Sequence, residues 1–124
     1  MVKRTRAQRQ KQAIDTIKES DIKIALAFFN NSCAYCNVRL INETGYDNSL
    51  EIDHYRSLAE QDNNDEYQIL EGLTIQNALP VCRECNRKKY NSNAEEWIKS
   101  YFPNAEEIIY NIEYYFSLQG EDYV

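Results

Sequence analysis

The sequence contains one histidine, and it has no cysteine outside two Cys-x-x-Cys pairs. It also lacks a long apolar run, because the most apolar stretch, residues 24–29, is far too short to span a bilayer. The basic start is followed by polar helix formers and not by the apolar segment of a signal peptide. These absences predict a cytoplasmic protein with no membrane partner. Thiols stay reduced in the cytoplasm, so paired cysteines there more often bind a metal than form a disulfide.

The chain also lacks a net positive charge. Its formal charge at pH 7 is −6 over 124 residues, which argues against a protein that coats nucleic acid with its whole surface. The charge is unevenly distributed: residues 1–23 carry seven Lys/Arg against three Asp/Glu, whereas residues 91–124 carry one against seven. A polyanion would therefore have to bind at local basic patches, in the N-terminal arm and around residues 83–89.

Composition divides the one expected domain, residues 1–124, into three segments. Residues 1–31 form a basic, helical N-terminal segment, residues 32–91 a central module, and residues 92–124 the C-terminal helices. No internal repeat or low-complexity segment stands out. Short strands in the middle of the chain with helices on both sides predict an α+β fold.

The N-terminal segment is expected to hold two helices. Thr5 is a suitable N-cap for the first, which would carry Ile14 and Ile17 on one face, and residues 19–21 are expected to break it. The basic arm has two interpretations, a solvated, frayed terminus or an arm that contacts phosphates. Its residues are Lys3, Arg4, Arg6, Arg9 and Lys11.

The central module is expected to consist of strands and turns until its last helix. Residues 38–41 and 50–54 are expected strands, and the second alternates apolar with polar side chains. Residues 59–72 are acidic and polar, which predicts an exposed loop, and a helix is expected from Arg83 onward. Two further helices are expected after capping boxes, with apolar stripes that form core; the boxes begin at Ser92 and Asn104.

The two cysteine pairs, Cys33/Cys36 and Cys82/Cys85, predict a tetrahedral structural zinc site. Each pair supplies two thiolates from one tight turn, and four thiolates close the coordination sphere. A redox dithiol is disfavoured by the presence of two pairs, whereas iron in the same sulfur cage stays open. Because a closed four-cysteine site leaves no position for a substrate, any catalysis must come from elsewhere.

The single histidine, His54, follows Asp53 at the end of the second expected strand. A neutral imidazole can act as a general base near pH 7, and hydrolysis of a phosphodiester also requires a cation that neutralises charge. Asp53 and the amide of Asn86, directly after Cys85, offer oxygen ligands to a hard divalent ion. If the zinc site brings these residues together, they form a candidate catalytic site.

These residues together resemble the HNH endonucleases of the zinc-bound ββα-metal (His-Me finger) superfamily. The resemblance covers residues 33–91 and rests on the cysteine pairs, on Asp53-His54 between them, and on Asn77-Ala-Leu-Pro-Val before the final Cys-x-x-Cys-Asn-x-Lys-Lys. It implies a small ββα-metal (HNH) module with a four-cysteine zinc site, flanked by N-terminal and C-terminal helices.

The resemblance also implies a role for each motif residue. His54 would activate water, Asp53 and Asn86 would bind Mg²⁺ or Mn²⁺, and Asn77 would hold the loops of the site together. Four basic residues would contact phosphates, unless they are simply solvated: Arg56, Arg87, Lys88 and Lys89. The chain departs from the common pattern in having Asn rather than His at position 86, no proline after Asp53-His54, and an acidic insertion.

The sequence therefore predicts a metal-dependent endonuclease that nicks or cuts double-stranded DNA, with weak sequence specificity or a targeting protein partner. Such a protein fits a bacterial cell and could be phage-encoded or serve in defence. The alternative is a non-catalytic zinc module that binds DNA or a protein partner. The acidic surface allows a third interpretation, a nucleic-acid mimic that occupies the basic groove of another protein.

Overall fold

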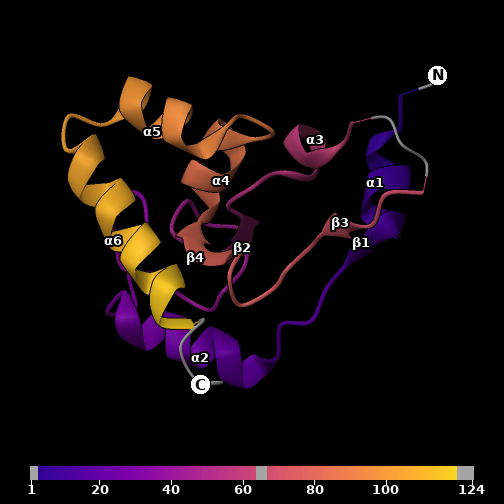
Figure 1. Ribbon diagram of the computed structural model, residues 1–124. Coiled ribbons are helices and arrows are strands. Elements are labelled where there is room, and N and C mark those ends of the chain that lie inside the picture. Colours follow the sequence, from indigo (N-terminus) through magenta and orange to yellow (C-terminus); the bar gives the residue numbers. More distant parts are fainter. Residues whose placement is uncertain (1–2, 64–66, 120–124) are drawn as a thin grey trace.

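The computed structural model describes residues 3–63 and 67–119, which form an α+β fold (Figure 1). Residues 64–66 of the expected acidic loop and 120–124 of the C-terminal segment lie outside the described residues. The elements in chain order are α1 (Arg6–Gln12), β1 (Ala13–Ile14), α2 (Glu19–Phe28), β2 (Leu50–His54), α3 (Leu58–Gln61), β3 (Leu70–Glu71), β4 (Ala78–Cys82), α4 (Arg83–Lys89), α5 (Ala94–Tyr101) and α6 (Ala105–Gln119).

The middle of the chain forms a two-stranded sheet followed by a helix. Strands β2 and β4 pair antiparallel, with Leu50 opposite Cys82 and His54 opposite Ala78, and α4 begins where β4 ends. The alternating pattern of residues 50–54 and the helix from Arg83 onward are thus confirmed. The register places the end of β2 beside the start of β4, away from the cysteines.

The core lies between this sheet and three helices, α2, α5 and α6. Figure 1 shows these helices around the sheet on the side away from α1. Trp97 and Ile98 of α5 are buried together with Ile108, Ile112 and Tyr115 of α6, so the expected apolar stripes form core except at Tyr101, which is exposed. Helix α5 begins one residue later than expected, because its N-cap is Asn93 and not Ser92. The Asn93 side chain accepts a hydrogen bond from the backbone N–H of Glu96. No helix in the described ranges has both the length and the apolarity to cross a bilayer.

The N-terminal segment differs from the expectation after its first helix. Thr5 caps α1, as expected, and the structure adds a reciprocal capping box with Gln8. The chain then becomes extended, so Ile14 lies on a strand and not on a helical face, and Glu19 to Asp21 begin the next helix instead of breaking one. The acidic residues at these positions favour a helix start because they complement its positive end.

Two further sequence expectations need correction. Residues 38–41 make isolated bridges through Arg39 and Ile41 and no regular strand. The acidic insertion is not wholly a loop, because it contains α3 and β3, and β3 pairs in parallel with β1. The paired residues lie 57 positions apart in sequence, with Ala13 opposite Leu70 and Ile14 opposite Glu71. This pairing brings the N-terminal arm onto the central module.

Candidate functional site

The four cysteines come together in one cluster. Their sulfur atoms all lie within 4.8 Å of one another, and the Sγ atoms of Cys36 and Cys82 are 3.7 Å apart. A disulfide would need about 2.05 Å, whereas tetrahedral zinc with Zn–S bonds of about 2.3 Å places its sulfurs roughly 3.8 Å apart. The spacing and the thiol donors therefore fit a zinc ion. The exposed fraction of Cys33, Cys82 and Cys85 is 3% or less.

Backbone geometry at each pair directs N–H groups at the sulfurs. Cys33 Sγ accepts from the backbone N–H groups of Tyr35 and Cys36 at 3.4 and 3.5 Å, and Cys82 Sγ accepts from Cys85 N–H at 3.4 Å. Asn37 closes the first turn at φ 66°, a region that asparagine tolerates better than most residues. Such donors favour the thiolate form that metal binding requires.

The crowding of the sulfurs also affects their protonation. The hydrogen bond between Cys33 and Cys36 is the largest cause in both, raising the pKa of Cys33 to about 12 and lowering that of Cys36 to about 2. Contact with Cys33 likewise raises the pKa of Cys85. Four thiolates this close repel one another unless a cation binds between them. A divalent metal removes that conflict.

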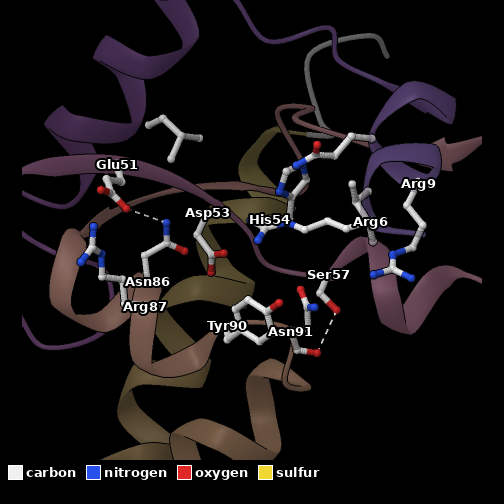
Figure 2. A pocket seen from close by; sticks show the side chains of 13 residues that line it. Arg6, Arg9, Glu51, Asp53, His54, Ser57, Asn86, Arg87, Tyr90 and Asn91 are labelled. Atoms are coloured by element: carbon white, nitrogen blue, oxygen red, sulfur yellow. Dashed lines mark hydrogen bonds between the residues drawn. The ribbon is translucent and has the colours of Figure 1, made fainter. Parts of the chain in front are cut away.

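The cluster includes Cys82, the N-cap of α4, and Cys85 in its first turn. A cavity of about 700 Å³ is lined by residues of β2 and α4 (Figure 2). Strand β2 contributes Glu51, Asp53 and His54 to its lining, and α4 contributes Asn86 and Arg87. Asp53, His54 and Asn86, which are up to 33 positions apart in sequence, thus face one space. The other wall comes from α1 and from the segment after α4.

Asp53 occupies a buried ion pair. Its Oδ2 accepts a hydrogen bond of 2.7 Å from Tyr35 Oη and lies 3.1 Å from Lys89 Nζ. Burial raises the pKa of the Asp53 carboxyl, although Lys89 and Tyr35 oppose that shift. Within the described ranges, no hydrogen bond engages the second oxygen, Oδ1. One carboxylate oxygen is therefore held by protein groups, and the other is available to a ligand.

Asn86 is oriented by a residue that the sequence analysis missed. Its Nδ2 donates to Glu51 Oε1 at 2.8 Å. A carboxylate can only accept, so the NH₂ of the amide must face Glu51. The amide oxygen then points toward Asp53, as Figure 2 shows. Glu51, Asp53 and Asn86 all line the cavity, and carboxylate and amide oxygens are the donors that Mg²⁺ and Mn²⁺ prefer.

His54 is half-buried at the edge of the cavity. In the part of the chain that the structure describes, neither ring nitrogen makes a hydrogen bond, so both are free to meet a ligand. Burial lowers the pKa of the imidazole, against the opposing effect of Asp53 and Asp15. The peptide group after His54 is fixed, because Lys89 Nζ donates to His54 O at 3.0 Å and Tyr55 N–H donates to Asn77 O at 2.8 Å.

Asn77 is fully buried outside the cavity and ties two segments together. Its Oδ1 accepts from Arg56 N at 2.7 Å, and its Nδ2 donates to Arg56 O at 3.2 Å and to Gly72 O at 3.1 Å. The backbone directly after His54 is thereby joined to the turn before β4. Asn77 is thus connected to His54 through the backbone and does not line the cavity.

Comparisons with protein families, with curated proteins and with solved structures found no match. The resemblance to HNH endonucleases therefore rests on the motif residues of the sequence alone.

The structure separates the basic residues that the sequence grouped as phosphate contacts. Arg87 lines the cavity. Lys89 is fully buried in its pair with Asp53, and a buried ammonium group cannot contact a bound phosphate, which corrects the expectation. Lys88 faces the other way, where its Nζ donates to Tyr101 Oη at 2.6 Å. Arg56 pairs with Glu71 and does not line the cavity.

The cavity also includes residues that the sequence had not assigned to the site. Glu51 could have been found, because strand alternation puts it on the same face as Asp53. Tyr90 follows α4 with φ 49°, and the guanidinium carbon of Arg6 lies 5.6 Å from its ring centroid. The sequence offered Arg6 and Arg9 only as part of a basic arm that could contact phosphates, because their approach to the cavity depends on the long-range pairing of β1 with β3.

Proposed function

We propose that this protein is a metal-dependent endonuclease that hydrolyses phosphodiester bonds in DNA. One observation carries the proposal: Asp53, His54 and Asn86 line a single cavity, and the helix that carries Asn86 starts at a four-cysteine cluster that fits zinc. The zinc would be structural, because its four ligands leave no open position. A second ion, Mg²⁺ or Mn²⁺, would be held by Asn86 Oδ1 and Asp53, with Glu51 as a further oxygen donor.

The residues of the cavity divide the work of hydrolysis. His54 accepts a proton from the attacking water at a ring nitrogen, the oxygen of that water forms a bond to phosphorus, the P–O bond to the leaving oxygen breaks, and that oxygen takes up a proton from solvent. The divalent ion, when bound, neutralises charge on the phosphate and on the leaving oxygen. Arg87 contributes a fixed positive charge at the same wall. Lys89 and Asn77 hold the backbone of His54, which orients its ring.

Plasmid cleavage tests the proposal. Supercoiled plasmid is incubated with zinc-loaded wild type and with His54→Ala, with Mg²⁺, with Mn²⁺ and without added divalent metal. Wild type should nick or linearise the plasmid only with added metal, and His54→Ala should be slower by about 10²–10⁴-fold, as is typical for loss of a general base. Lys99→Ala, which changes an exposed cation on α5, serves as the matched control and should cleave like wild type.

Two results would contradict the assignment: an intact plasmid with wild type under every metal condition, or equal cleavage by His54→Ala. Circular dichroism and zinc content, measured for all three proteins, show whether a loss of activity reflects a loss of fold.

A second function is favoured by one observation, the existing pair between Asp53 and Lys89. Lys89 already neutralises the carboxylate, so the site is stable without a second metal. The protein would then be a non-catalytic zinc module that binds DNA or a protein partner. Wild type that binds labelled DNA but leaves it intact with Mg²⁺ and Mn²⁺ would favour this function over the nuclease.

A further inference from the structure

Hydrogen bonds hold the N-terminal arm against the central module. The Asp15 Oδ1 atom accepts from Leu73 N–H at 2.8 Å, and Leu73 O accepts from the N–H groups of Thr16 and Ile17 at 3.0 and 2.9 Å. The approach is close at Gly72, where an added Cβ would lie 2.0 Å from Asp15 Oδ1 and 2.8 Å from Ile14 O. This segment of the arm is therefore held by backbone contacts that leave no room for a larger side chain.

The other end of α1 is held by a buried arginine. Arg4 is 6% exposed, its Nη1 lies 3.3 Å from Asp62 Oδ1, and its Nη2 donates to Gln68 O at 3.1 Å. With contacts at both ends, α1 is a fixed wall and not a frayed terminus. Its position relative to the cavity is thus a property of the fold.

The five basic residues of the arm consequently have different roles. Arg4 is structural, and the exposed Lys3 and Lys11 do not line the cavity. Arg6 and Arg9 do line it. Figure 2 shows both on the side opposite Arg87, with Asp53 and His54 between them.

Arg6 and Arg9 are held by groups that leave their charge uncompensated. Arg9 Nη1 donates to Arg4 O at 2.9 Å, and Arg6 lies against the ring of Tyr90. Among the described residues, neither forms an ion pair with a carboxylate, and the same holds for Arg87. The cavity lining has three arginines against two carboxylates, a local charge of +1 in a chain of net charge −6. An anion is attracted here although the molecule as a whole repels it.

We infer that α1 forms one half of a phosphate-binding site, which we call the cradle. In it, Arg6 and Arg9 bind the nucleic-acid backbone on one side of the phosphodiester bond that lies at His54, and Arg87 binds the backbone on the other side. The guanidinium group suits this task because it donates two parallel hydrogen bonds to a phosphate. The identity of the ligand as DNA rests on the proposed function, whereas the phosphate chemistry follows from the arginines. The arm is then part of the site, outside the region covered by the motif.

Binding without cleavage tests the cradle. A short fluorescein-labelled DNA duplex is titrated with zinc-loaded protein at several salt concentrations, without Mg²⁺ or Mn²⁺, and fluorescence anisotropy gives Kd. Arg6→Ala/Arg9→Ala should weaken binding by at least about tenfold, since two charged hydrogen-bond donors are lost. The slope of log K against log salt should become shallower by roughly 1.8, or about 0.9 for each lost phosphate contact.

The matched control is Lys3→Ala/Lys11→Ala, which removes the same charge from the same arm but from outside the cavity. It should change Kd much less and leave the salt slope near that of wild type. Equal losses in the two double variants would show that the arm acts only through its overall charge, and an unchanged Kd in Arg6→Ala/Arg9→Ala would show that it does not bind the backbone. Either result overturns the inference.

These outcomes are independent of the nuclease assay. Wild type that binds through Arg6 and Arg9 but never cleaves would refute the proposed function and support the cradle. Wild type that cleaves with Mg²⁺ and is unaffected by Arg6→Ala/Arg9→Ala would do the reverse.

Discussion

Replacing Lys89 with methionine removes an ammonium group from the buried pair with Asp53 while keeping a side chain of similar length. Both side chains are almost fully enclosed, with exposed fractions of 0% for Lys89 and 7% for Asp53. Removing one partner of such a pair leaves an uncompensated buried charge and costs about 3–5 kcal/mol. The hydrogen bond to His54 O is lost as well. Against a typical stability of about 5–15 kcal/mol for a domain, this loss is severe.

The assay is urea unfolding of zinc-loaded protein, followed by circular dichroism without other divalent metals. Lys89→Met should lower the free energy of unfolding by about 3–5 kcal/mol. Lys88→Met is the control: this neighbour on α4 is exposed, so its unfolding midpoint should stay close to that of wild type. A double variant, Lys89→Met/Asp53→Asn, removes both charges and should recover part of the loss, because coupled neighbours are not additive.

A change of less than about 1 kcal/mol in Lys89→Met would refute the reasoning, because a net hydrogen bond alone is worth that much. It would mean that Asp53 does not depend on Lys89 and that its carboxylate is solvated or protonated. A double variant no more stable than Lys89→Met would likewise show that the charge on Asp53 is not the source of the cost.

Two further predictions concern the supports of the site. Cys82→Ser should lose bound zinc and compactness, measured by metal analysis and by size-exclusion chromatography, whereas His54→Ala should keep both; equal zinc content in wild type and Cys82→Ser would exclude the four-thiolate site. Asn77→Ala should lower stability by about 2–4 kcal/mol, because it removes three hydrogen bonds to the backbone of Arg56 and Gly72, and the bond to Gly72 is buried. Asn77→Ala should also slow plasmid cleavage while zinc content is unchanged. Full activity would show that the hydrogen bonds of Asn77 do not position His54.

Sequence periodicity was sufficient for the elements that carry the motif. The alternation of residues 50–54 predicted β2, and the cysteine spacing predicted the cluster, because both signals are local. The same signals failed for β1 and β3. Two-residue strands have no measurable period, and their pairing depends on contacts between residues 13–14 and 70–71. The sequence therefore predicted a helix break at residues 19–21, whereas the first helix ends at Gln12 and the second begins at Glu19.

The burial of Lys89 shows a different kind of error. Arg87, Lys88 and Lys89 form a basic run, and a run of charges suggests a solvated surface. On a helix, however, neighbours in sequence face different directions, and Lys89 lies four residues after the buried Cys85, on the same face. Helical geometry alone separates the inward Lys89 from the outward Lys88. The pairing of Lys89 with Asp53 was harder to predict from the sequence, because Asp53 was already assigned as a metal ligand.

Helix α4 links the supports of the site to one another. It has seven residues, fewer than an isolated helix needs to be stable in water. Its position therefore depends on tertiary contacts at its two ends: the cysteine cluster at its start and the pair of Lys89 with Asp53 at its end. Asn86 and Arg87 lie between these anchors and face the cavity. Loss of either anchor should displace both side chains, so Lys89→Met should impair DNA cleavage even under conditions in which the protein remains folded.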